Sequence, residues 1–388
     1  MDIVPARLSN HRLLGRTLSR PEQVVEWLGA VQAQDFAAAK WAVALRMKSA
    51  RDTDIERAFD AGRILRTHVL RPTWHFVLPD DIRWMLELTA PRIRPILAYG
   101  DRRNGIDRAL ISRAERIVER ALEGGKHLTR EELAAELAKH GIEARGQKLA
   151  HIVAHAELDA LICSGPLRGR QFTYALLEER VPKVRRLTRD ESLATLALRY
   201  FRSHGPATLH DFAKWSGLSL KEAREAVALD GSVREAQRDS GMYRHVRSTS
   251  SGAVPSPHAR LLSIYDEYVI AYRDWDVLCG ERGLKQRLFA QGNAIPNVLL
   301  IDGRIAGTWR RSLTEKEARL TITPLRKLTP EEKAAVDQEV ERYSEFLGRP
   351  VSAQLTAAAR GSGARKRKIR LYVDMLERGE TIHPQRRK

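Results

Sequence analysis

The sequence predicts an α+β fold, with three tandem winged-helix domains followed by a β-rich C-terminal domain. Three stretches each combine capped amphipathic helices with a short strand pair, which is the element order of a winged helix. Beyond Val254 the chain instead alternates apolar and polar residues around Asp302-Gly303, a hairpin signal. The expected domains cover residues 1–104, 105–187, 188–253 and 254–355, and a basic tail covers 356–388.

The composition is that of a globular protein with a polyanionic partner. The hydrophobic fraction is 43%, the net charge is +18 and the sequence pI is near 10.2. Residues 360–388 hold ten Lys or Arg against three acidic residues, a net +7, so the rest of the chain keeps +11. Nucleic acid is therefore the expected partner, and an anionic membrane surface is the weaker alternative.

Several classes are excluded by pattern. No apolar run of about 18 residues exists, so no membrane span is expected. The N-terminus lacks the apolar core of a signal peptide. Cys163 and Cys279 are the only cysteines, which fits a reducing cytoplasm and gives no disulfide framework. We expect a cytoplasmic, nucleoid-associated protein of bacterial type.

The first winged helix is expected near the N-terminus. A capping box from Ser19 to Glu22 begins a helix that extends to about Val31, and two further helices follow. The segment "ILRTHVLRPTWHFVLP" then predicts two strand arms, interrupted where Pro72 cannot join the ladder.

The second winged helix begins with a capping box from Thr129 to Glu132. "RGQKLAHIVAHAELDALICSG" predicts a longer helix, and "PLRGRQFTYALL" supplies the wing. Lys148, His151 and His155 point away from the apolar face of this helix, towards phosphates or solvent. The two histidines have a metal-ligand spacing, but no third ligand is evident and no metal is expected.

The third winged helix is the clearest. A helix stops at Gly205, and capping boxes begin the next two helices at Thr208 and Ser219, with a turn at Gly217. "VREAQRD" and "YRHV" predict a strand pair with a turn at Ser240-Gly241.

The C-terminal domain is predicted to consist of strands followed by a helix. "RLLSIYDEYVIAY", "NVLLIDGRIAGTWRR" and "ARLTITPL" are strand-like, and Thr329 with Pro330 begins a last helix. "AAARGSGARKRK" predicts a flexible linker into the tail.

Two neutral amides, Gln32 and Gln34, stand out in "AVQAQDFAAAK". On one helix they would diverge by about 200°. Asp35 is well placed to cap the next helix, so the two amides are expected at a helix–helix junction, in non-helical geometry. They either cap helix ends or face solvent, or they act together on one atom.

The ordered segments "VQAQD", "RTHVLRPTWHFVLPDDIRWML", "SHGPATLHDFAKWSGL", "YDEYVIAYRD" and "NVLLIDGRIAGTWRR" resemble the AlkZ/YcaQ family of winged-helix DNA glycosylases, in its Gln-x-Gln form. The resemblance covers residues 5–350. It implies tandem winged helices and a β-domain around a DNA-binding channel. It also implies that Gln32 and Gln34 position the water that attacks a damaged nucleotide.

Neutral amides suit one class of substrate. An N7-alkylated purine already carries positive charge, so its departure needs no general acid, and water orientation remains the main task. Glutamine offers acceptor and donor atoms in fixed directions without being a strong base. We therefore expect a cofactor-free, monomeric, monofunctional glycosylase that acts on cationic alkylpurines in double-stranded DNA, and bulky adducts or interstrand crosslinks fit the same chemistry.

Other residues are weaker candidates. Asp35 is a cap or a catalytic carboxylate, His75 is a buried histidine or a group near the lesion, and Asp266 is structural or part of a carboxylate pair. The candidate DNA contacts are Arg71, Lys148, His151, His155, Arg168, Arg170 and Arg244. The rival function is a non-enzymatic winged-helix DNA binder or transcription regulator, which would usually be a dimer.

Overall fold

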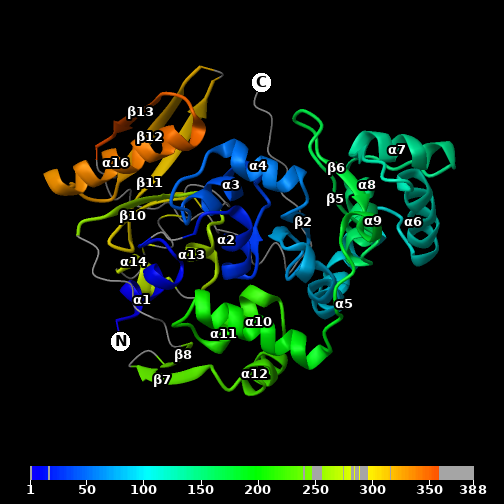
Figure 1. Cartoon of the computed structure of the whole chain (residues 1–388), viewed down its shortest axis with the longest axis horizontal. Helices are drawn as coiled ribbons and strands as arrows, with labels where there is room; N and C mark the ends of the chain where they lie inside the picture. The colour runs from blue at the N-terminus through cyan, green and yellow to red at the C-terminus, as the bar shows by residue number, and fades with distance from the viewer. Residues whose placement is uncertain are drawn as a thin grey trace. The chain divides into compact units, whose positions relative to one another are not determined.

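The computed structural model describes residues 2–15, 18–238, 241–246, 256–273, 275–280, 284, 288, 296–314 and 316–357 (Figure 1). Its contacts divide the chain into two compact units. The first joins the N-terminal segment up to Ala58 with the chain from Thr188 onward, and the second runs from Phe59 to Leu187. Both units mix helices and strands, so the α+β class is confirmed. The tandem winged-helix arrangement and the domain borders stay predictions.

The N-terminal part of the first unit is mostly helical. Its elements are α1 (Ile3–Asn10), α2 (Pro21–Leu28), β1 (Val31–Gln32), α3 (Phe36–Ala44) and α4 (Asp52–Asp60), whose last turn enters the second unit.

The expected capping box at Ser19 is wrong. The helix begins at Pro21, and the side chain of Gln23 accepts hydrogen bonds from the backbone N–H groups of Ser19 and Arg20. The helix also ends earlier than expected, because Gly29 takes a positive φ of 84° directly after Leu28.

Three helices and a hairpin follow Thr188 in the same unit. They are α10 (Arg189–Ser203), α11 (Leu209–Ser216), α12 (Leu220–Ala228), β7 (Arg234–Arg238) and β8 (Gly241–His245). The capping boxes at Thr208 and Ser219 are confirmed, and left-handed Gly217 ends α11 as expected. Ser240, half of the expected turn, lies outside the described residues.

A five-stranded sheet completes the first unit, in the order β13-β12-β11-β10-β9. Its strands are β9 (Ala259–Leu262), β10 (Asn297–Ile301), β11 (Arg304–Leu313), β12 (Ala318–Pro324) and β13 (Val351–Leu355). The Asp302-Gly303 hairpin is confirmed, with φ of 49° and 78° at its two central residues. Helix α16 (Pro330–Leu347) begins at the Thr329 capping box and packs against β9 and β13 (Figure 1).

The strand expected over "YDEYVIAY" is wrong. Tyr265 has a positive φ of 64°, and the Asp266 side chain then caps the short helix α13 (Glu267–Ile270). The side-chain bond from Asp266 to the backbone N–H of Tyr268 favours the helical turn over continued pairing. A second short helix, α14 (Asp276–Cys279), follows.

The second unit begins with the hairpin of β2 (Leu65–His68) and β3 (Trp74–Val77), as expected. The elements after it are α5 (Pro79–Arg103), α6 (Arg108–Leu122), β4 (Leu128–Thr129), α7 (Arg130–Lys139), α8 (Gly146–Leu158), β5 (Ile162–Ser164), β6 (Thr173–Leu176) and α9 (Leu177–Arg180). The capping box at Thr129 is confirmed. Helix α8 is shorter than expected, because Ala160 takes a positive φ of 56° and β5 begins two residues later.

Apolar residues of α6, α7 and α8 form the core of this unit, with β5 and β6 beside them. In the described part of the chain no helix is long and apolar enough to cross a membrane. The predicted basic tail lies outside the described residues from 358 onward.

Candidate active site

The Gln-x-Gln segment lies between α2 and α3 in the first unit. Val31 and Gln32 are extended, and Asp35 has extended φ and ψ of −101° and 108° before α3 begins at Phe36. The expected non-helical geometry of the segment is therefore confirmed. Gln32 is buried at 6% exposure, whereas Gln34 is half-buried.

Asp35 caps helix α3. Its carboxylate Oδ1 accepts the backbone N–H of Ala38 at 2.9 Å, and the residue is exposed to solvent. A carboxylate at a helix N-terminus also interacts favourably with the helix dipole. The geometry favours the cap over the catalytic alternative.

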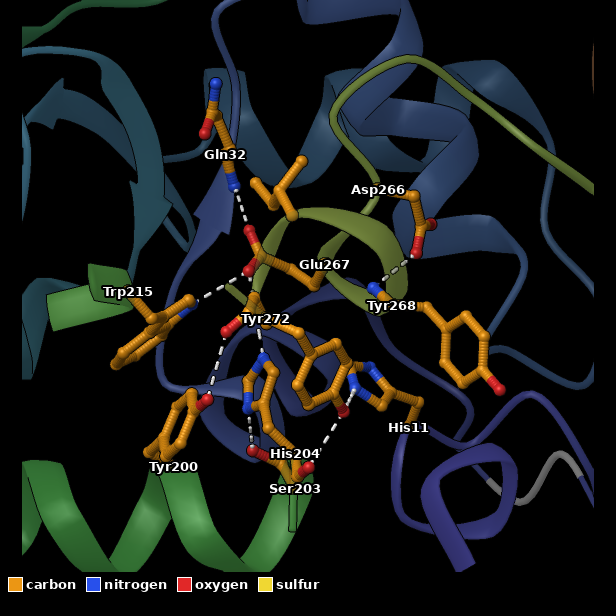
Figure 2. Close-up of polar contacts among 12 residues, drawn as sticks. His11, Gln32, Tyr200, Ser203, His204, Trp215, Asp266, Glu267, Tyr268 and Tyr272 are labelled. Atoms are coloured by element: carbon orange, nitrogen blue, oxygen red, sulfur yellow. Dashed lines mark hydrogen bonds and ion pairs between the residues drawn. The ribbon is translucent and has the colours of Figure 1, made fainter. Parts of the chain in front are cut away.

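The backbone of Gln32 is bound by the buried carboxylate of Glu267 (Figure 2). Glu267 is fully buried, and its Oε1 accepts the backbone N–H of Gln32 at 2.7 Å. Its Oε2 accepts the indole N–H of Trp215 at 2.8 Å. Figure 2 shows the side-chain amide of Gln32 pointing away from this carboxylate. The backbone of Gln32 is therefore fixed while its amide is directed to the opposite side.

Two buried histidines, His204 and His11, lie on the side of Glu267 that faces away from Gln32. His204 Nε2 is 3.7 Å from Glu267 Oε2, and His204 Nδ1 lies 2.7 Å from the Ser203 hydroxyl. His11 Nε2 lies 2.8 Å from the Tyr272 hydroxyl, which donates to the His204 carbonyl (Figure 2). Burial lowers the pKa of both imidazoles, although Glu267 opposes the shift at His204. The lowered pKa values favour the neutral form of both rings.

Asp266, a candidate site residue, points into a different buried contact. Its two oxygens receive two hydrogen bonds from Arg46, at 2.9 and 2.8 Å, and neither side chain is exposed. Arg46 also donates to the carbonyl of Ala42 in α3. Asp266 thus ties α3 to α13, which is the structural role weighed from the sequence.

His75 lies in β3 of the second unit and is fully buried. Its Nδ1–H donates to the Thr73 carbonyl at 2.9 Å, since a carbonyl can only accept, and Nε2 lies 3.0 Å from the Arg71 guanidinium. The favoured interpretation, a buried and hydrogen-bonded histidine, is confirmed. The guanidinium of Arg71, a candidate DNA contact, therefore already has this ring as one hydrogen-bond partner.

The expectation that His151 and His155 point away from the core is wrong for His155, which is 6% exposed. Both rings meet the carboxylate of Asp101 on α5, at 2.7 and 3.0 Å. The apolar periodicity of α8 does not indicate this partner, because Asp101 lies on another helix. Among the described residues no group of three or more potential ligands is suited to a metal ion.

The remaining candidate contacts differ in accessibility. Arg168 is exposed and pairs with Glu132 at 2.6 Å, Arg170 is exposed and Lys148 is half-buried. Arg244 pairs with Glu235 at 2.5 Å, and its side chain is only 13% exposed. Its expected contact with phosphate is therefore not favoured.

Glu267, Trp215 and Arg46 are the residues at this site that sequence reasoning missed. Glu267 follows Asp266 in "YDEY" and Trp215 lies near the end of "TLHDFAKWSG", and neither segment indicates a partner far along the chain. Two adjacent carboxylates between Tyr265 and Tyr268, in an otherwise mostly apolar run, are a usable signal, because buried charges need partners.

Comparison with known proteins agrees with this geometry. The family model "DNA glycosylase AlkZ-like" matches residues 25–346. The interstrand DNA cross-link repair glycosylase of Streptomyces sahachiroi is 24% identical over 340 residues, which cover 82% of this chain and 88% of the relative. The solved structure of the DNA glycosylase AlkZ from the same organism has a TM-score of 0.73 at 22% identity, and covers 91% of this chain and 98% of its own. The overall fold is therefore shared with a solved glycosylase.

Proposed function

The chain belongs to the family of AlkZ-like DNA glycosylases, as its resemblance predicted, and we propose that it releases purines that alkylation has made cationic, of the N7-alkylguanine type. Membership shows the enzyme class, an N-glycosyl hydrolase acting on DNA. The charge of the lesion, the form of the DNA and the catalytic residues are parts of the proposal.

The reaction needs a nucleophile more than an acid. Water oxygen forms the new bond to C1′ of the sugar, and the N-glycosidic bond breaks. Its electron pair returns to the ring nitrogen and neutralises the cationic base. The proton of the attacking water passes to solvent. Because the leaving group brings its own positive charge, the protein must chiefly orient the water.

Gln32 and Gln34 fit this task. Their amides offer one acceptor oxygen and two donor hydrogens each, and they stay neutral throughout the physiological pH range. One observation carries the proposal: a fully buried carboxylate holds the backbone N–H of Gln32 at 2.7 Å, which fixes the strand that presents the amide. A water-orienting group needs such rigid support, since small displacements are costly in rate.

Interstrand crosslinks belong to the same chemical class when the crosslinked atom is a purine N7. The relative named for interstrand cross-link repair supports bulky lesions as substrates of this chain. We further propose that the enzyme acts as a monomer on double-stranded DNA of the bacterial nucleoid. The transcription-regulator alternative is not favoured, because the family to which the chain belongs is named for an enzyme activity.

The test is base release from a duplex that contains one N7-methylguanine. Wild-type protein should release free base, and Gln32→Ala or Gln34→Ala should slow the single-turnover rate by roughly a hundredfold or more. Affinity for DNA should change little in either variant, because phosphate contacts dominate binding. If both variants excise at the wild-type rate, the catalytic site lies elsewhere.

A further inference from the structure

A basic groove runs along α6 in the second unit, away from the Gln-x-Gln segment in the sequence and in a separate unit. The cavity has a volume of about 620 Å³. One wall carries Arg113, Arg116 and Arg120 of α6, and Lys126 follows on the loop to β4. Ile117 and Leu128 add apolar side chains to the lining of the groove.

None of the described residues neutralises these cations. Within the part of the chain that the structure describes, the charged groups of Arg116, Arg120 and Lys126 make no hydrogen bond or ion pair. Arg113 donates to a backbone carbonyl, that of His140, which leaves its charge uncompensated. Other cations of the same unit do have carboxylate partners, for instance Arg83 with Glu178 at 2.9 Å.

Nearby acidic residues do not cancel this charge. Glu136, which also lines the groove, pairs with Lys139 at 2.7 Å. Glu115 precedes Arg116 on α6, and burial together with the nearby Asp159 carboxylate raises its pKa to about 8. The raised pKa favours the neutral form of Glu115. The groove lining itself carries four Arg or Lys side chains against one carboxylate.

The spacing of the cations suits a polyphosphate chain. Arg113, Arg116 and Arg120 stand at i, i+3 and i+7, on one face of α6, and span about 10 Å of helix axis. One DNA strand carries a phosphate for each ~3.4 Å of duplex axis, so roughly three phosphates fit the same length. Arginine suits phosphate oxygens because its guanidinium donates in a planar fork.

We propose that the α6 groove binds the phosphate backbone of duplex DNA, as a second docking surface beside the winged strands and helices expected from the sequence. The inference rests on the proposed function, because DNA is the polyanion that a glycosylase meets. Such a surface would add sequence-independent affinity and would help to hold the duplex while the enzyme searches for damage.

The test is the salt dependence of binding to an undamaged duplex. The triple variant Arg116→Gln, Arg120→Gln, Lys126→Gln should bind more weakly than wild type. Each lost phosphate contact lowers the slope of log affinity against log salt by about 0.9, so the slope should fall by about two to three. All three side chains are exposed, so circular dichroism and the melting temperature should match the wild type.

A matched control removes the same charge elsewhere. Lys183→Gln, Arg319→Gln, Arg326→Gln also removes three cations, each exposed and paired with a carboxylate, at positions outside the helices and hairpins of the expected winged helices. Its slope should fall by less than one. Equal slopes for the two triple variants, or a wild-type slope in the groove variant, would overturn the proposal.

Two further outcomes separate this proposal from others. If the groove variant loses as much affinity for polyglutamate as for duplex at the same ionic strength, the groove is a general anion surface and its assignment to DNA fails. If wild-type protein binds duplex with the expected slope but releases no base, the proposed function fails while the groove stands.

Discussion

Glu267 is the residue that connects the candidate catalytic amide to the rest of the first unit. Its two oxygens accept from Gln32 and Trp215, so both lone-pair directions that matter are occupied by N–H donors. A neutral amide in its place would turn an NH₂ group towards one of those donors. The two bonds therefore depend on a carboxylate at this position.

We expect Glu267→Gln to lower the single-turnover rate of base release by roughly ten- to a hundredfold, because Gln32 loses its anchor and the water it orients is misplaced. DNA affinity should stay near that of wild type. Glu339→Gln is the control, since Glu339 is a buried carboxylate of the same unit that faces Arg260 and Arg342. Equal rate losses in the two variants would point to general loosening of the unit and against positioning by Glu267.

Glu115 provides a residue-scale prediction on stability. Burial, and then the neighbouring Asp159, raise its pKa from 4.5 to about 8 in the folded protein. The folded state therefore holds this proton more tightly than the unfolded state. Its stabilising contribution is full below about pH 4.5 and is lost as the pH rises through about 8.

Glu115→Gln removes that dependence. The melting temperature of wild type, measured against that of the variant, should fall between about pH 5 and pH 8 and then level off. Glu143→Gln, at an exposed carboxylate of the same unit, should follow the wild-type profile. A constant difference between wild type and Glu115→Gln across this range would contradict the raised pKa.

At the scale of elements, α3 depends on Asp35, the residue that caps its N-terminus. Asp35 caps the helix directly after the Gln-x-Gln segment, so the same side chain ends the extended segment and begins the helix. A cap and a catalytic carboxylate differ in what they require. A cap needs only a side-chain oxygen that accepts, whereas catalysis by a carboxylate needs its charge.

Asp35→Asn should therefore keep both the stability and the excision rate close to wild type, because asparagine caps helices about as well as aspartate. Asp35→Ala should cost about 1 kcal/mol of unfolding free energy, measured by denaturant titration. Loss of excision in the asparagine variant, with its stability retained, would make Asp35 a catalytic group.

Local elements were readable from the sequence where their signals are local. The capping boxes expected at Thr129, Thr208 and Ser219 and the helix start expected at Thr329 depend only on residues within four positions, and all four are confirmed. The capping box expected from Ser19 to Glu22 is wrong for an equally local reason. The side chain of Gln23, one residue further on, accepts the backbone N–H groups of Ser19 and Arg20.

Contacts across long stretches of chain were not readable. The bond between Gln32 and Glu267 spans 235 residues, and that between Arg46 and Asp266 spans 220. Asp101 reaches His155 from another helix, which no apolar periodicity of α8 can indicate. The sequence therefore located the amide pair and its non-helical setting, but not the residues that hold it in place.

At the scale of the whole molecule, attraction to DNA and the proposed base release depend on different groups. The chain carries +18, which accounts for attraction to DNA in general, whereas the two amides carry no charge and cannot contribute to that attraction. Under the proposed function, two uncharged amides limit the reaction to lesions that carry a positive charge. The proposed substrate range of the whole enzyme therefore follows from the two uncharged side chains of Gln32 and Gln34.

The most direct measurement is single-turnover excision from a panel of duplexes, each with one defined lesion. N7-methylguanine and N3-methyladenine, which are cationic, should be released, and bulky N7 adducts should also be substrates. Uracil, hypoxanthine and 8-oxoguanine, which are neutral, should stay in place, because neither Gln32 nor Gln34 can protonate a leaving base. Efficient release of uracil or hypoxanthine would require a general acid and would contradict the role of the two amides in orienting water.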